Sequence, residues 1–180
     1  MANPNSTDLI GVGRDALRQG RFADAERWLG QALQTAPATA ELLFLYGTAL
    51  AQTGKRPEAI RCLTGALSAA PNDAAIINNL ATVLRQSDRL DEAERHLRRG
   101  LALHPKSPDL LVSTGQVLRA QARHDQAAEC ASLALTLMPD HAEALVLAGL
   151  VLCDAGKAAE AIAYFERAVA AKPNHASLSP

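Results

Sequence analysis

Apolar residues recur three and four positions apart along most of the chain, in short stretches separated by polar turns. In the stretch 40–73 the first such set is Leu43, Tyr46 and Leu50. This spacing places the three side chains on one face of a helix. Gly54 follows, and glycine favours a helix end because it tolerates the left-handed backbone conformation. A second apolar set comes after this glycine, so the pattern predicts two amphipathic helices joined by a tight turn.

A proline closes this pattern every 34 residues, without insertion or deletion between copies. Proline does not continue a helix, because it lacks the amide proton and its ring clashes with the preceding turn. A fixed period of this length is typical of stacked supersecondary repeats rather than of one compact core. The prolines are Pro37, Pro71, Pro105, Pro139 and Pro173. They divide the chain into cap residues 1–5, five repeats (6–39, 40–73, 74–107, 108–141 and 142–175) and a short tail 176–180.

Three further positions carry the same kind of residue in successive repeats. The first predicted helix has a small residue, at Gly13, Gly47, Ala81, Gly115 and Gly149. The second has an invariant alanine, at Ala25, Ala59, Ala93, Ala127 and Ala161. Four residues later the chain carries Leu29, Leu63, Leu97, Ala131 and Phe165. Helices that pack about 8–10 Å apart need small side chains at the closest point and larger ones on either side.

These positions resemble the tetratricopeptide repeat, whose pattern reads W-x2-L-G-x2-Y, then A-x3-F, then P. The resemblance covers residues 6–175, and all five copies agree in register. It implies an all-α fold, a right-handed α-α superhelix (a solenoid) of antiparallel helix pairs. The fourth repeat departs most, with Thr114, Ala122 and Ala131 where the pattern has leucine, a turn glycine and an aromatic residue. We therefore predict that the fourth repeat is the least stable.

Composition and charge restrict the partners of the chain. It has 18 basic and 19 acidic residues, so no basic excess is present to bind nucleic acid. No run of 18 apolar residues predicts a membrane-spanning helix, and the N-terminus lacks the pattern of a secretory signal. Cys62, Cys130 and Cys153 are widely spaced and odd in number, which favours a reducing, cytoplasmic location.

No sequence motif for catalysis, a cofactor or a metal is present. The chain has no Gly-rich phosphate loop, no G-x-S-x-G and no H-E-x-x-H, so we expect no enzymatic activity. Cys62, His96 and Cys130 share one position in successive repeats. Equivalent helices of adjacent repeats lie roughly 10 Å apart, whereas zinc requires ligand atoms about 2.0–2.3 Å from one centre. Trp28 and Tyr164 also occupy this column, so we interpret it as a packing position.

The resemblance implies that the first helix of each repeat lines a concave groove that binds proteins or peptides. Arg85 and Arg119 occupy the same place in adjacent repeats, and forked arginine donors suit a ligand with an acidic group. Asn79 matches one rung of the asparagine ladder that binds peptide backbone in some members of this family. The alternatives are solvated helix charges for the arginines and a local backbone hydrogen bond for Asn79. The candidate partner-binding residues are Arg14, Arg18, Phe44, Thr48, Asn78, Asn79, Thr82, Arg85, Val112, Gln116, Arg119 and Val146.

The sequence therefore predicts a protein–protein interaction scaffold with a peptide or protein partner, and no nucleic acid or membrane partner. The carboxylate clamp of co-chaperones that bind chaperone tails is not expected, because Leu150 and Asp154 stand where it needs basic residues. Two alternatives are the substrate-recognition region of a larger transferase-type enzyme and a homodimer formed through the C-terminal edge. That edge carries Ile162, Phe165 and Val169, which have no following repeat to pack against.

Overall fold

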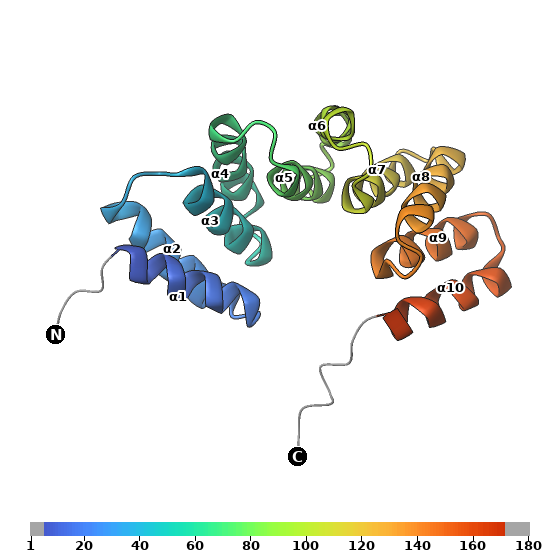
Figure 1. Cartoon of the computed structure of the whole chain (residues 1–180), viewed down its shortest axis with the longest axis horizontal. Helices are drawn as coiled ribbons and strands as arrows, with labels where there is room; N and C mark the ends of the chain where they lie inside the picture. The colour runs from blue at the N-terminus through green and yellow to red at the C-terminus, as the bar shows by residue number, and fades with distance from the viewer. Residues whose placement is uncertain (1–5, 172–180) are drawn as a thin grey trace, which may run out of the picture. The chain divides into compact units, whose positions relative to one another are not determined.

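The computed structural model describes residues 6–171, so the predicted cap residues 1–5 and the tail 176–180 lie outside the described part. Within that part the chain forms ten helices and no strand, which confirms the all-α fold class (Figure 1). The helices are α1 (Ser6–Arg18), α2 (Phe22–Thr35), α3 (Ala40–Gln52), α4 (Arg56–Ala69), α5 (Ala74–Gln86), α6 (Leu90–Leu103), α7 (Pro108–Ala120), α8 (His124–Leu137), α9 (Ala142–Asp154) and α10 (Ala158–Ala171).

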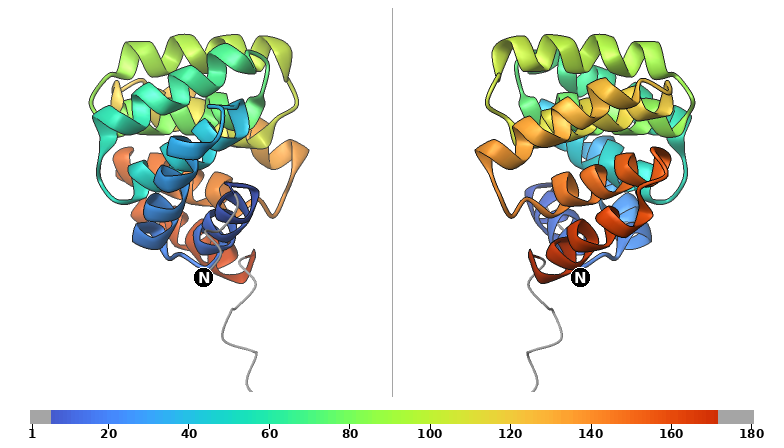
Figure 2. Two further views of the ribbon diagram at one scale, coloured as in Figure 1. Left: turned by 90° about the vertical axis from the view of Figure 1, so that its left-hand side faces the viewer. Right: turned by 90° about the vertical axis from the view of Figure 1, so that its right-hand side faces the viewer.

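The helices group into two compact units, with the boundary between Arg89 and Leu90. In unit one, α1 pairs with α2 and α3 with α4, and α4 packs on α5. In unit two, α7 pairs with α8 and α9 with α10, and α8 also packs on α9. Figure 2 shows these paired helices from two sides. These four pairs agree with the first, second, fourth and fifth predicted repeats, whereas α5 and α6 of the third belong to different units. The exact repeat boundaries stay a prediction.

Side-chain caps begin several of the first helices. The hydroxyl oxygen of Thr39 accepts a hydrogen bond from the amide of Leu42 at 3.2 Å, at the start of α3. The carboxylate of Asp73 accepts from the amides of Ala75 and Ile76 at 2.8 and 3.1 Å, at the start of α5. Such caps satisfy amide groups that have no partner within the helix. They therefore fix where the second and third repeats begin, directly after the loops that contain Pro37 and Pro71.

The turn between the two helices of each repeat needs a left-handed backbone. The residue there has a positive φ in all five repeats, at Gly20, Gly54, Asp88, Ala122 and Gly156. Glycine adopts this conformation without steric cost, whereas the Cβ of alanine approaches the carbonyl oxygen. Asp88 and Ala122 are the two members with a Cβ, both at φ 59°. The short polar side chain of aspartate is tolerated in this conformation, so Ala122 is the more strained of the two.

Replacing Ala122 with glycine is expected to stabilise the protein by about 0.5–1 kcal/mol, because the strain at φ 59° is relieved. The measurement is urea denaturation followed by circular dichroism. Ala163→Gly is the matched control, since Ala163 is exposed inside α10 and glycine there should cost about 1 kcal/mol. The same sign for both variants would contradict this account of the turn.

Small and large residues interlock in the core as the sequence predicts. A Cβ atom placed on Gly13 would overlap Leu29, and one placed on Gly149 would lie 2.6 Å from the ring of Phe165. In the fourth repeat the space beside the small residue is filled by a different helix. A side chain at Gly115 would overlap Leu147 of α9, not Ala131 of its own repeat. Leu147 is 1% exposed and therefore fills space that the small Ala131 leaves beside Gly115.

A glutamate links neighbouring repeats at two equivalent places. Glu26 of α2 accepts a hydrogen bond from the hydroxyl of Thr53 at 2.7 Å and pairs with Lys55. Glu94 of α6 accepts from the side chains of Gln121 and Arg123, both at 3.0 Å. These donors hold the pKa of each carboxyl below its ordinary value, chiefly through the bond from Lys55 for Glu26 and from Gln121 for Glu94. In both places a second helix is fixed to the turn of the next repeat.

Candidate functional site

Three predicted site residues of unit one lie around a single small hollow. Thr48 projects from α3, and Asn79 and Thr82 project from α5. The hollow has a volume of about 40 Å³ and is called here the α3–α5 hollow. Its other lining residues are Ala51, Gln52, Leu63, Val83 and Gln86. The sequence alignment of the first helices thus brought together residues that are about 34 positions apart in the chain.

The polar groups of the α3–α5 hollow differ in their free hydrogen-bonding capacity. The hydroxyl of Thr48 donates to the carbonyl of Phe44 at 2.8 Å, and that of Thr82 donates to the carbonyl of Asn78 at 2.9 Å. Both hydroxyl oxygens keep lone pairs for a further donor. Within residues 6–171 the side chain of Asn79 makes no hydrogen bond, so its amide can both donate and accept. An amide with this freedom matches the alternating groups of a peptide backbone.

The remaining predicted residues of unit one have varied surroundings. Arg14 of α1 forms an ion pair with Glu41 of α3, and Arg18 lies 3.6 Å from Asp15. Phe44 is half-buried on α3. Arg85 and Asn78 each interact with another group of the protein.

In unit two, Arg119 of α7 is held by Asp154 of α9. The Nε and one terminal nitrogen of the guanidinium donate to the two carboxylate oxygens, the second bond at 3.0 Å. These bonds hold the pKa of the Asp154 carboxyl below its ordinary value, and Nδ1 of His124 lies 3.4 Å from the same group. One pair of forked donors of Arg119 is therefore already used, and its charge is balanced by Asp154. The predicted pairing of Arg85 with Arg119 joins residues of different units and stays a prediction.

The other predicted residues of unit two lie on α7 and α9. Val112 is 4% exposed and belongs to the apolar core, so it offers little surface to a partner. Gln116 and Val146 are half-buried and accessible from one side.

The column of cysteine and histidine residues is half-buried on the second helices. Burial raises the pKa of the Cys62 and Cys130 thiols and lowers that of His96. The Cβ of Cys62 faces Gly47 at the closest approach of α3 and α4. No group of three or more His, Cys, Asp or Glu side chains suited to a metal ion occurs in the part of the chain that the structure describes. Among the same residues, no helix is long and apolar enough to cross a membrane.

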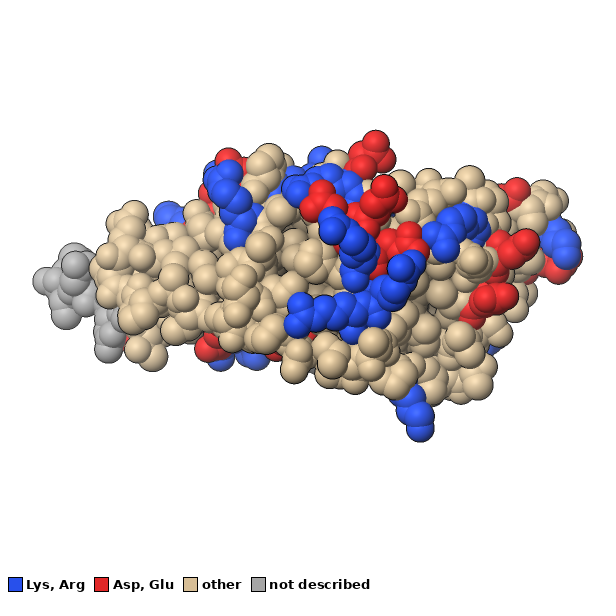
Figure 3. Space-filling view, turned by 90° about the horizontal axis from the view of Figure 1, so that it is seen from above, with Lys and Arg blue, Asp and Glu red and all other residues tan. Residues whose placement is uncertain are grey.

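The surface charge is mixed on the face shown in Figure 3. Lys and Arg side chains lie close to Asp and Glu side chains there, in keeping with a formal net charge of −1. Nucleic acid binding needs a surface dominated by positive charge, so this face does not have the required character.

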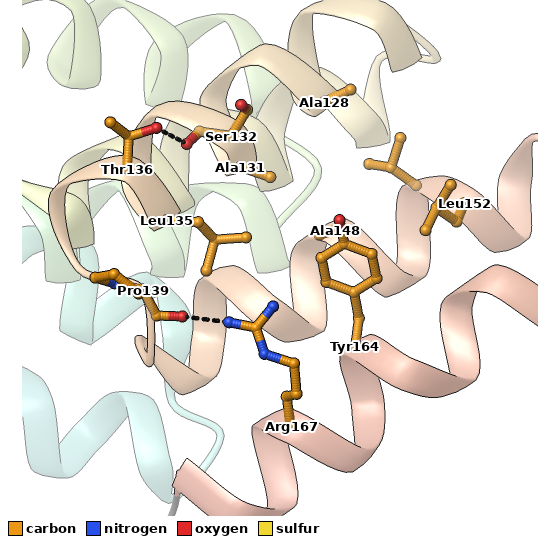
Figure 4. A pocket seen from close by; sticks show the side chains of 11 residues that line it. Ala128, Ala131, Ser132, Leu135, Thr136, Pro139, Ala148, Leu152, Tyr164 and Arg167 are labelled. Carbon is orange, nitrogen blue, oxygen red and sulfur yellow. Dashed lines mark hydrogen bonds between the residues drawn. The ribbon is translucent and has the colours of Figure 1, made fainter.

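Sequence reasoning missed a larger hollow in unit two, between α8 and α10 with α9 at its base (Figure 4). It has a volume of about 430 Å³ and is called here the α8–α10 hollow. The lining residues are Ala128, Ala131, Ser132, Leu135, Thr136, Pro139, Ala148, Val151, Leu152, Tyr164 and Arg167. Ala131 and Ala148 were a usable signal, because every other repeat carries a larger residue at these positions.

Comparisons with known proteins agree with this architecture. Family models described as "Tetratricopeptide repeat" match residues 16–81 and 58–112, and a further one matches residues 112–176. No curated protein sequence matches the chain.

Several solved structures share the fold. A thermophilic TPR protein of Thermus thermophilus, TTC0263, superposes with a TM-score of 0.84 at 19% identity, over 95% of this chain and 93% of that one. A crystal structure of MamA has a TM-score of 0.69 at 24% identity, over 89% and 94% of the two chains. YrrB, described as a TPR protein with an unusual peptide-binding site, has a TM-score of 0.64 at 19% identity, over 95% and 88%. At these identities the likeness shows the fold, a solenoid of paired helices.

Proposed function

The chain belongs to the tetratricopeptide repeat family, and from this premise we propose that it is an interaction scaffold that binds a peptide or partner segment along its first helices. Repeats of this kind expose one helix of each pair on an extended surface, and surface side chains select the partner. Catalysis is not part of the proposed function, and a cytoplasmic location is proposed with it. The partner is a protein in both this proposal and its alternative below.

The observation that carries the proposal is the α3–α5 hollow. Among the described residues Asn79 presents an amide without an internal partner there, and the hydroxyl groups of Thr48 and Thr82 line the same hollow. Gln52 and Gln86 add two further amides at exposed positions of the same wall. These amide and hydroxyl groups can form hydrogen bonds with the backbone amides and carbonyls of an extended segment. Because the groups are neutral, they bind a segment of either charge. An acidic group on the partner would bind to Arg85, which lies on α5 with Asn79.

A triple variant tests this proposal: Gln52→Ala, Asn79→Ala and Gln86→Ala, used as bait in a lysate pull-down read by mass spectrometry. We expect the loss of partners that the unaltered protein captures. The control variant Gln31→Ala, Gln34→Ala, Arg61→Ala removes exposed polar groups from the second helices α2 and α4 and should keep them. Equal capture of partners by both variants would show that the first-helix surface is not the binding site.

Self-association is a second candidate, because α10 leaves an apolar face uncovered within the described residues. Ile162 is 56% exposed and Val169 is 76% exposed, and both border a hollow with Phe165 and Glu166. In contrast, α8 packs against α9 of the following repeat. Analytical sedimentation of the double variant Ile162→Ser, Val169→Ser tests self-association. A homodimer formed through this edge would dissociate in the variant, whereas a monomeric protein would sediment as before.

A further inference from the structure

We propose that the α8–α10 hollow is a second binding site, separate from the first-helix surface, which receives a bulky apolar side chain of a partner protein that carries an acidic group beside it. Two features of the molecule support this site: the origin of the hollow and the chemistry of its walls.

The hollow exists because a position that holds a large side chain elsewhere is occupied by Ala148. The equivalent residues are Tyr46 in the second repeat and Leu80 in the third. In unit one the ring of Tyr46 packs against Gly30 of α2, and so fills the corner between the helices. In unit two the counterpart of Tyr46 is Ala148, and the neighbouring Leu147 packs against Gly115, so the space above Ala148 stays open. A volume of about 430 Å³ falls within the range of ligand pockets, roughly 300–1,000 Å³.

The walls select an apolar group with a negative or neutral end. Leu135, Val151 and Leu152 supply aliphatic surface, and the ring of Tyr164 closes one side. Among the lining residues Arg167 alone is charged, and no lining residue is acidic. Figure 4 shows Tyr164 and Arg167 side by side on α10, across the hollow from Leu135 of α8.

Arg167 is positioned to donate to an incoming carboxylate. One terminal nitrogen of its guanidinium donates to the carbonyl of Pro139 at 2.9 Å, which fixes the side chain over the mouth of the hollow. Asp140 lies 3.8 Å from that nitrogen and is highly exposed. The guanidinium has five N–H donors, so others stay available for a partner's acidic group.

The partner is taken as a polypeptide rather than a small molecule because the chain is proposed above to bind proteins, and in this respect the site rests on that proposed function. The positive charge of Arg167 on an otherwise uncharged lining selects a segment that carries an acidic residue beside a bulky apolar one.

The test uses a short peptide, acetyl-Gly-Phe-Asp-Gly-amide, titrated into the protein with the methyl NMR signals of Leu135, Val151 and Leu152 as the readout. We expect saturable shifts of these methyl groups. Changing Phe to Ala in the peptide should weaken binding about tenfold or more, because the ring no longer enters the hollow. Changing Asp to Asn should weaken it about two- to fivefold, as expected for a partly exposed ion pair.

Variants of the protein locate the site. Ala148→Leu restores the residue type of Leu80 and places a larger side chain at the base of the hollow, so it should weaken the shifts while circular dichroism shows an unchanged fold. Ala163→Leu adds the same atoms to an exposed position of α10 and should leave binding intact. Arg167→Gln should remove the preference for Asp over Asn even if Ala148→Leu disturbs folding. Absent shifts, or equal binding by the Ala148→Leu and Ala163→Leu variants, would overturn the proposal.

Discussion

Replacing Leu147 with alanine is expected to lower the free energy of unfolding by about 3 kcal/mol. Leu147 is 1% exposed and lies in the apolar cluster of unit two, between Gly115 of α7 and Ala131 of α8. Its removal would leave a cavity that none of these small neighbours can fill, so the cavity cost adds to the lost burial. Urea denaturation measures the loss, and hydrogen exchange of α7 to α9 shows whether it is local.

Leu45→Ala is the matched control for this prediction. Leu45 holds the same position in the second repeat, but it is half-buried and Leu63 already fills the space beside Gly47 there. The same chemical change should therefore cost clearly less than it does at Leu147. Equal losses at the two sites would show that Leu147 has no special role in replacing the missing side chain at Ala131.

The part played by Leu147 bears on the predicted weakness of the fourth repeat. In the sequence, the small Ala131 indicates a poorly packed helix pair, because the comparison with the repeat pattern considers only the residues of the fourth repeat itself. In the structure the missing volume is supplied from the next repeat, by α9. The strained turn at Ala122 is supported from the preceding repeat, because Glu94 of α6 holds Gln121 and Arg123 on either side of it. The low stability of this repeat stays a prediction, which hydrogen exchange would test.

The sequence predicted those features that depend on spacing along one chain segment. Helix pairs, the left-handed turn at Gly54 and the interlocking of Gly13 with Leu29 all follow from a period of 34 residues and from local propensity. The glutamate links did not follow, although Glu26 and Glu94 hold equivalent positions in their repeats. Their partners lie in the next repeat, and pairing of that kind depends on how two helices are set against each other.

In the candidate site, too, the sequence predicted positions along one helix face but not contacts between repeats. Alignment of first helices placed Thr48, Asn79 and Thr82 around one hollow, because equivalent positions of adjacent repeats share a face. It gave no indication that Asp154 occupies the donors of Arg119, since that contact joins side chains 35 residues apart. The position of a residue in its repeat therefore predicts the helix face on which its side chain lies. Whether that side chain is free to bind a partner depends on contacts from the neighbouring repeat.

Gly115→Ala is expected to destabilise the protein by about 2 kcal/mol, because an added methyl group would overlap Leu147 and approach rigid neighbours. The Cβ would lie 3.1 Å from the Cβ of Cys130 and 3.3 Å from the carbonyl oxygen of Ala127. Gly11→Ala is the control, since nothing lies within 4 Å of that position and alanine is the better helix former by about 0.5–1 kcal/mol. The two identical substitutions should therefore have opposite signs in urea denaturation.

Combining Gly115→Ala with Leu147→Ala separates overlap with Leu147 from overlap with the backbone. In the Leu147→Ala background the methyl group at Gly115 has room, so its cost should fall by at least about 1 kcal/mol, a coupling typical of residues in contact. An unchanged cost would assign the strain to Cys130 and Ala127 instead, and would mean that Leu147 does not occupy the space beside Gly115. The cycle thus measures directly how far the fifth repeat completes the packing of the fourth.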